Sequence, residues 1–251
     1  MINKVFRSEA DLHNLSLKRT LPVAKGENLD YKKKVVNKPW GYEYLMFENE
    51  HVAIWVLHLK NNFATSMHCH PNKKTSLSVL SGKVVSSTLD TKFPLEKGGA
   101  LLIDKGVFHS TVGASEEGAF IMEIETPPDK NDLVRLKDSY GRENKAYEGE
   151  NFISDSTSEY EYFDFHDCKL EEEPKHSRLL RDASCTIVRD SVANICSYRL
   201  PENANYCFLD GHTEEWREFS LPGVGDLFTY AELKKIAAYS VDEVREILII
   251  E

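Results

Sequence analysis

Between Lys38 and Thr126 the chain is a series of short apolar or alternating runs, and this stretch restricts the fold more than any other feature. Gly, Asn and Asp interrupt the runs at short intervals, so little chain is left for the helical crossovers that parallel sheets need. Closely spaced strands of this kind are typical of β-sandwiches and barrels. We therefore predict an all-β domain with strands at residues 42–48, 51–59, 65–69, 75–81, 83–89, 99–103, 109–112 and 119–126.

Three histidines in this region have a spacing that suits one metal ion. His68 and His70 are one residue apart, so on a strand both side chains point to the same face. His109 follows Gly106 at the start of another predicted strand and could complete a facial three-histidine set. Neutral imidazole is the commonest transition-metal ligand in proteins. The alternative is three unrelated histidines, but similar turns precede both segments, which favours a metal site.

The first of these segments resembles a sequence motif of the cupin superfamily. His68, His70 and Gly82 stand at the motif's positions. Asn62 replaces its first glycine, which is compatible with the motif because Asn also enters turns with positive φ. Thr75 stands where the family has a metal-binding glutamate, so the chain departs from the pattern at one ligand.

The second segment resembles the other cupin motif in spacing. Gly98, Gly106 and His109 match the motif at its spacing. Asp104 stands at the position of its proline, and Gly113 at the position of its asparagine. The resemblance implies a double-stranded β-helix, or jelly roll, with a divalent transition metal held by His68, His70 and His109. This ligand set does not separate zinc, iron, manganese and nickel.

Two flanking segments narrow the resemblance to the cupin domain of type II phosphomannose isomerases, including those fused to mannose-1-phosphate guanylyltransferase. They are Lys38-Pro-Trp-Gly-Tyr-Glu43 before the first strand and Asn131-Asp-Leu-Val-Arg-Leu-Lys-Asp-Ser-Tyr-Gly-Arg142 after the last. The resemblance covers residues 38–145. We place Trp40 and Arg142 with the substrate-binding residues and Arg135 with the catalytic ones. The alternatives are that Trp40 caps the barrel core and that both arginines form a salt-bridged lid with neighbouring aspartates.

Glu123 and Glu125 are candidate acid–base residues on the predicted strand after His109. Strand alternation puts both carboxylates on one face and Ile124 on the other. Beside a metal, two carboxylates could divide the roles of ligand and general base. The alternative is that this face is the barrel exterior.

Composition excludes several classes of partner. The formal net charge of −10 argues against nucleic acid and acidic membrane surfaces. No apolar run approaches the ~20 residues that span a bilayer, and residues 1–10 lack a signal-peptide core. The five cysteines include no Cys-x-x-Cys pair, which indicates free thiols in a reducing cytoplasm.

We predict three regions: an N-terminal strap (1–37) with a short helix near 9–17, a metal-binding cupin domain (38–148) and a degenerate second cupin-like β domain (149–251). Residues 127–150 are expected to form a charged loop with one helical turn. The last region is expected to be β-rich, so that the chain is a bicupin, with strands at 186–189, 195–200, 206–209, 227–230 and 246–250. A short helix is possible at 231–238 or 241–248, since periodicity does not decide between helix and strand there.

The resemblance implies a metal-dependent isomerase or epimerase that acts on a sugar or sugar phosphate, in surface-polysaccharide synthesis. Two other functions are compatible with the same residues: a three-histidine non-haem iron dioxygenase, and a non-catalytic sugar-binding or regulatory cupin, which Thr75 favours. By analogy with cupins we expect a small-molecule substrate and a homodimer.

Overall fold

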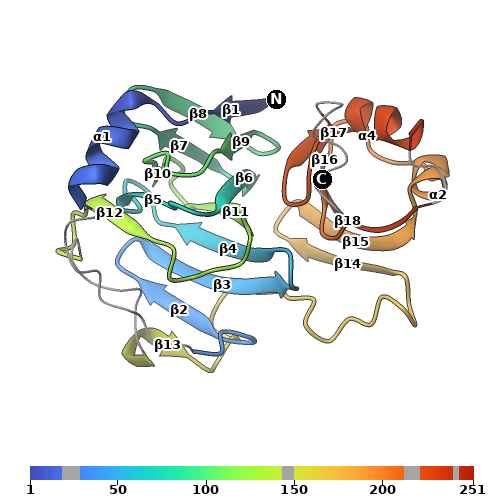
Figure 1. Ribbon diagram of the computed structural model, residues 1–251. Coiled ribbons are helices and arrows are strands. Elements are labelled where there is room, and N and C mark those ends of the chain that lie inside the picture. The colour runs from blue at the N-terminus through green and yellow to red at the C-terminus, as the bar shows by residue number, and fades with distance from the viewer. Residues whose placement is uncertain (19–28, 143–149, 212–220, 240–242) are drawn as a thin grey trace.

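A computed structural model describes residues 1–18, 29–142, 150–211, 221–239 and 243–251 (Figure 1). The N-terminal part is a barrel in which one large sheet is opposed by two smaller ones. Its large sheet has the strand order β1 (Ile2–Val5), β9 (Ala100–Ile103), β6 (Lys74–Ser81), β11 (Ala119–Thr126), β4 (Ala53–Leu59), β3 (Gly41–Glu48), β2 (Val35–Lys38) and β13 (Ile153–Ser154). Opposite lie β12 (Val134–Lys137) with β5 (Met67–Cys69), and β10 (Ser110–Gly113) with β7 (Lys83–Ser87) and β8 (Lys92–Glu96).

The strand pairs are nested in sequence. β4 pairs with β11, β6 with β9 and β7 with β8. Between them, bridges such as His68↔His109 join the segments around β5 and β10. Pairs that enclose one another in this way define a jelly roll, because the folded-over hairpin is wound up as one unit. The predicted all-β double-stranded β-helix is confirmed.

Both faces of the large sheet are buried, and β11 shows how its residues divide. Phe120, Met122 and Ile124 belong to a core that also contains residues of the C-terminal part. Ile121 packs into the barrel interior, where Glu123 and Glu125 also point. The period-2 alternation therefore places the two carboxylates inside the barrel.

The N-terminal strap is part of the barrel. Its predicted helix is present as α1 (Glu9–Lys18). β1 pairs in parallel with β9, and β2 pairs with β3 in the large sheet. The proposed boundary at 148/149 lies outside the described residues. The short helix η1 (Glu150–Phe152), which follows it, precedes β13, and β13 pairs with β2 in the large sheet.

The interpretation of 127–150 as a loop with a helical turn was wrong in one segment, since β12 pairs with β5 there. Alternation explains the strand. Val134 and Leu136 pack against a small core around Phe108, while the buried Arg135 faces the polar barrel interior. The charged composition hid this alternation.

The C-terminal part forms one antiparallel sheet beside the barrel, drawn orange to red in Figure 1. Its strand order is β14 (Lys175–Leu180), β15 (Ala183–Ser191), β18 (Val244–Ile250), β16 (Asn205–Phe208) and β17 (Leu227–Thr229). One face packs on the barrel and the other packs under α2 (Val192–Ser197) and α4 (Tyr230–Ala237). This sheet occupies the region in which we expected a degenerate second barrel. Within the described residues it does not close on itself.

The predicted strand at 195–200 was wrong, because its first residues lie in α2. Ser191 caps this helix by accepting a hydrogen bond from the backbone N–H of Asn194, and Ile195 is buried on the helix face. Of the two alternatives for a later helix, 231–238 is confirmed by α4, while 244–248 lies in β18.

Gly225 lies where the C-terminal part meets the barrel. Its carbonyl accepts a hydrogen bond from Ser76 Oγ at 2.7 Å. Its φ is +77°, and an added Cβ would lie 1.8 Å from Thr126 Oγ1. Gly225→Ala should therefore lower the free energy of unfolding by the cost of a left-handed backbone, about 1–2 kcal/mol, plus about 1–3 kcal/mol of steric conflict.

Gly98→Ala is the matched control for this prediction. Gly98 has the same φ of +77°, but no atom of the described residues lies within 4 Å of its Cβ position. Urea unfolding of the two variants measures the difference. Equal losses of stability would contradict the close packing of Gly225 on the end of β11.

Candidate metal centre

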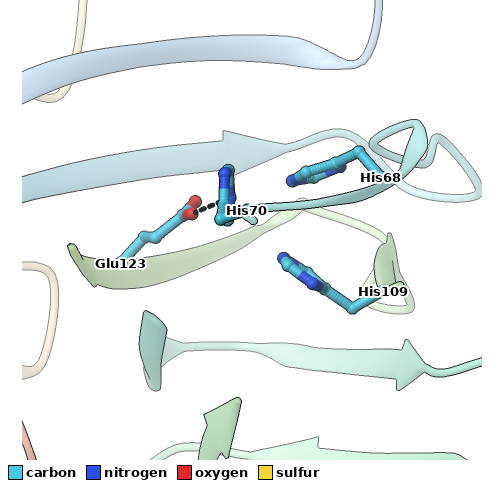
Figure 2. Close-up of side chains that lie close together, drawn as sticks. All are labelled: His68, His70, His109 and Glu123. Atoms are coloured by element: carbon cyan, nitrogen blue, oxygen red, sulfur yellow. Dashed lines mark ion pairs between the residues drawn. The ribbon is translucent and has the colours of Figure 1, made fainter. Parts of the chain in front are cut away.

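The three predicted ligands converge inside the barrel. The ring centroids of His68 and His109 are 4.5 Å apart, those of His68 and His70 5.0 Å, and those of His70 and His109 5.4 Å. Glu123 joins them, and one potential ligand atom from each of the four residues lies within 4.8 Å of the others. Figure 2 shows the three rings and the carboxylate directed toward a common centre.

Hydrogen bonds on the far side of each ring fix which nitrogen faces this centre. Nδ1 of His68 lies 2.8 Å from the carbonyl of Ser66, and Nδ1 of His109 lies 3.0 Å from that of Val107. A carbonyl oxygen can only accept, so each Nδ1 carries the proton and donates it.

His70 is oriented in the same way, because its Nδ1 donates to the carbonyl of Asp132 at 2.6 Å. Its Nε2 is buried and has no hydrogen-bond partner among the described residues. A buried acceptor without a donor is costly unless something else binds it, and a divalent metal would satisfy it.

Burial keeps the histidines neutral. It lowers the pKa of His109 and holds those of His68 and His70 well below the usual range, with further lowering from neighbouring positive groups. Imidazole binds a metal in its neutral form, so the three side chains are already in the ligating state.

The carboxylate of the site comes from a different strand than the cupin motif indicates. Thr75 occupies the motif's glutamate position on β6 and pairs with Glu125 on β11. Glu123, also on β11, places Oε1 3.6 Å from His70 Nε2. A histidine and carboxylate set is thus retained although the motif residue is threonine, and a divalent transition metal fits it.

A cavity of about 60 Å³ opens beside this centre. Its lining holds five basic side chains and three carboxylates, in addition to His68 and His70: Lys38, Lys73, Lys130, Arg135, Arg142, Glu43, Glu123 and Glu125. The basic excess in the lining contrasts with the net charge of −10 for the whole chain. Local charge of this sign favours an anionic ligand.

Two of the carboxylates are paired with lysines, of which Lys73 is buried and Lys130 is partly buried. Lys73 Nζ lies 2.6 Å from Glu125 Oε1 and donates to the carbonyl of Asp129 at 2.8 Å. Lys130 Nζ lies 3.1 Å from Glu43 and 3.4 Å from the centroid of the Trp55 ring. Burial alone would lower the pKa of Lys130, but the surrounding glutamates raise it above its usual value, so Lys130 stays charged.

The structure places each of the other predicted site residues at this cavity. Trp40 lines it and is buried in the barrel core, 4% exposed, as the capping alternative requires. Arg135 is buried on β12, where it pairs with His68 in register. Arg142 also lines the cavity, and it holds Asp138 through two side-chain hydrogen bonds of 3.1 and 2.6 Å.

The Arg142–Asp138 pair agrees with the lid alternative. Burial would raise the pKa of Asp138, but its hydrogen bonds with Arg142 hold it below the usual value. The guanidinium of Arg142 is therefore engaged by a carboxylate. Arg135 is buried, at 6% exposure. The sequence reasoning did not include Lys38, Lys73, Lys130 or Glu43. Lys38 belongs to the Pro-Trp-Gly segment, which was a usable signal, whereas nothing in the local pattern distinguishes Lys73 or Lys130 from surface lysines.

Comparisons with known proteins give likenesses at the level of structure. No family model and no curated protein matches the sequence. Solved structures that resemble the chain include an uncharacterized conserved protein with a double-stranded β-helix domain from Klebsiella pneumoniae (16% identity over 38% of this chain and 84% of that one, TM-score 0.35). A RmlC-like cupin from Shewanella frigidimarina is 13% identical over 42% of this chain and 96% of that one, with a TM-score of 0.36.

A third similar structure is the capsular polysaccharide assembling protein CapF from Staphylococcus aureus, which is 17% identical over 41% of this chain, with a TM-score of 0.38. The match spans 34% of that protein's length. In the part of the chain that the structure describes, no helix is long and apolar enough to cross a membrane. The nested strand pairs form a double-stranded β-helix, and the histidine set lies inside it.

Proposed function

We propose that the protein is a metal-dependent isomerase or epimerase of a small anionic sugar, such as a sugar phosphate. The observation that carries the proposal is a three-histidine, one-carboxylate set next to a cavity with an excess of basic side chains. A neutral sugar would not require that excess, and a simple sugar-binding pocket would not require a buried ligand set.

The roles follow from where the side chains lie. When bound, a divalent metal would polarise the carbonyl and the adjacent hydroxyl of the sugar. His68, His70, His109 and Glu123 would hold it. Zinc, iron, manganese and nickel are all compatible with these ligands.

Our candidate for the residue that moves the proton is Glu125. Its Oε1 is fixed by Lys73, while its Oε2 is buried and has no hydrogen-bond partner among the described residues. A carboxylate oxygen that is oriented by its neighbour and otherwise unengaged can take the proton from the carbon beside the polarised carbonyl and return it to the adjacent carbon. Arg135 and Lys38, which line the same cavity, would neutralise the anionic group of the substrate.

Proton exchange tests this function without knowledge of the product. The metal-loaded protein would be incubated in D₂O with a panel of aldose and ketose phosphates, and with the same sugars lacking phosphate. We expect deuterium to enter at the carbon next to the carbonyl of one phosphorylated sugar, and not in its neutral counterpart. Oxygen consumption with ferrous iron instead would support a dioxygenase. Sugar binding without any exchange would indicate a non-catalytic cupin.

Glu123→Gln and Glu125→Gln should separate the two carboxylates. Glu123→Gln removes a charged ligand and is expected to weaken metal binding at least about 10-fold, since even changes behind the ligands cost 10–100-fold. Glu125→Gln should retain the metal and slow deuterium exchange by about 10²–10⁴-fold, the usual contribution of a general base. Chelator competition and exchange rates measure the two effects in samples whose folding is verified by circular dichroism. Loss of metal from both variants alike would refute the division of roles.

A further inference from the structure

We propose that Asp11, on the N-terminal helix α1, positions the metal ligand His109 through the peptide group between Val107 and Phe108. The inference rests on the metal centre of the proposed function. The N-terminal segment would then orient a ligand of a metal site whose ligands lie about 60 to 110 residues further along the chain.

The first step is the contact between Asp11 and the loop that carries His109. Asp11 Oδ1 accepts the backbone N–H of Phe108 at 2.9 Å. Asp11 is 3% exposed and Phe108 is fully buried, so water does not compete for this hydrogen bond. A buried carboxylate is an unusual partner for a single backbone N–H, since it requires further donors to offset the loss of its hydration.

The second step is that Asp11 is itself held in place. Its Oδ2 accepts both the backbone N–H of Ser8 at 2.9 Å and the Ser8 hydroxyl at 2.8 Å. The Ser8 hydroxyl in turn accepts the N–H of Asp11 at 3.1 Å. These reciprocal bonds have the pattern of a capping box at the start of α1, and they provide the extra donors that a buried carboxylate needs.

The third step is geometric. The N–H of Phe108 and the carbonyl of Val107 belong to one planar peptide group and point in opposite directions. That carbonyl accepts the Nδ1 proton of His109 at 3.0 Å. By fixing the N–H, Asp11 fixes the direction of the carbonyl, and the carbonyl fixes the tautomer and orientation of the His109 ring. The negative charge also polarises the peptide, which strengthens the bond to Nδ1 and makes Nε2 a better ligand.

The fourth step is that the same segment holds the other end of the loop. The backbone N–H of Asp104 donates to the carbonyl of Val5 at 3.0 Å, where β1 runs alongside β9. Residues 104–108 are therefore attached to the N-terminal segment at both ends. In Figure 1, α1 lies at the edge of the barrel next to β12. A shift of α1 would be transmitted directly to the peptide behind His109.

Asp11→Ala tests this inference, with Ser8→Ala as the matched control. Both variants remove side-chain hydrogen bonds of the capping box, but only Asp11→Ala removes the acceptor for Phe108. Cobalt(II) would be loaded into the full chain, its affinity measured by chelator competition, and its ligand-field absorption recorded. We expect Asp11→Ala to lower cobalt affinity about 10–100-fold and to alter the absorption spectrum, as changes behind a ligating histidine do. Ser8→Ala removes the hydroxyl donor but keeps the bonds of the Asp11 carboxylate to the N–H groups of Phe108 and Ser8, so its loss of affinity should stay well below that of Asp11→Ala.

Asp11→Asn keeps the inference testable if the alanine variant folds poorly. Its amide oxygen can still accept from Phe108, but the charge is lost, so the expected affinity lies between those of Asp11→Ala and Ser8→Ala. A control variant that loses as much affinity as either Asp11 variant would overturn the inference. So would an unchanged affinity and spectrum in Asp11→Ala. Failure of the wild-type chain to bind any metal would instead overturn the metal centre itself.

Discussion

Replacing His109 with alanine is expected to remove metal and activity together. The site offers three imidazoles and one carboxylate, with all ligand atoms within 4.8 Å of one another. His109 is the ligand that comes from the β10 side of the barrel. Its removal therefore leaves the metal without a protein ligand on that side. Changes that only reorient a ligand cost 10–100-fold in affinity, so removal of the ligand should cost more than about 100-fold.

Metal content after dialysis, measured by elemental analysis, checks this expectation. His51→Ala is the control, since His51 lies at the surface beside Glu50 and outside the lining of the metal cavity. Its metal content should match the wild type. If His109→Ala retains stoichiometric metal while it remains folded, the three rings do not form the binding site.

The histidine site could be predicted because it depends on local periodicity. Side chains two residues apart on a strand point to the same face, whichever strand lies next to it. His68 and His70 were therefore paired correctly. The same rule put Glu123 and Glu125 on one face. It could not assign Glu123 to the histidines, because that depends on β11 lying between β4 and β6, which is a long-range pairing.

The charged residues of the interior could not be predicted from local patterns. Lys73 is 1% exposed, yet in the sequence it stands in the polar run Asn-Lys-Lys and resembles a solvated turn. The strand that carries Arg135 was missed for a related reason, since it alternates two apolar residues against a buried arginine, and Arg135 itself was assigned to the site only through the family resemblance. Where a barrel interior is polar, the usual link between charge and exposure no longer holds, and these errors fall on the residues that line the cavity.

Removing one partner of the buried pair Lys73–Glu125 should lower the free energy of unfolding strongly. The two side chains are 1% and 3% exposed and lie 2.6 Å apart. Lys73→Met would leave the Glu125 carboxylate buried without its counter-charge, and such losses cost about 3–5 kcal/mol. Urea unfolding measures the change. Lys83→Met is the control, because Lys83 pairs with Glu96 in full solvent, where an ion pair contributes about 0–1 kcal/mol.

The double variant Lys73→Met/Glu125→Gln shows whether the loss comes from the uncompensated charge. With no carboxylate left to neutralise, it should recover most of the stability lost in Lys73→Met, which is the signature of direct coupling between neighbours. Equal losses in the single and double variants would assign the cost to packing of the lysine stem instead. The double variant also separates stability from chemistry, because it lacks the Glu125 carboxylate. It should be well folded and bind metal through the four ligands, yet fail to exchange the substrate proton.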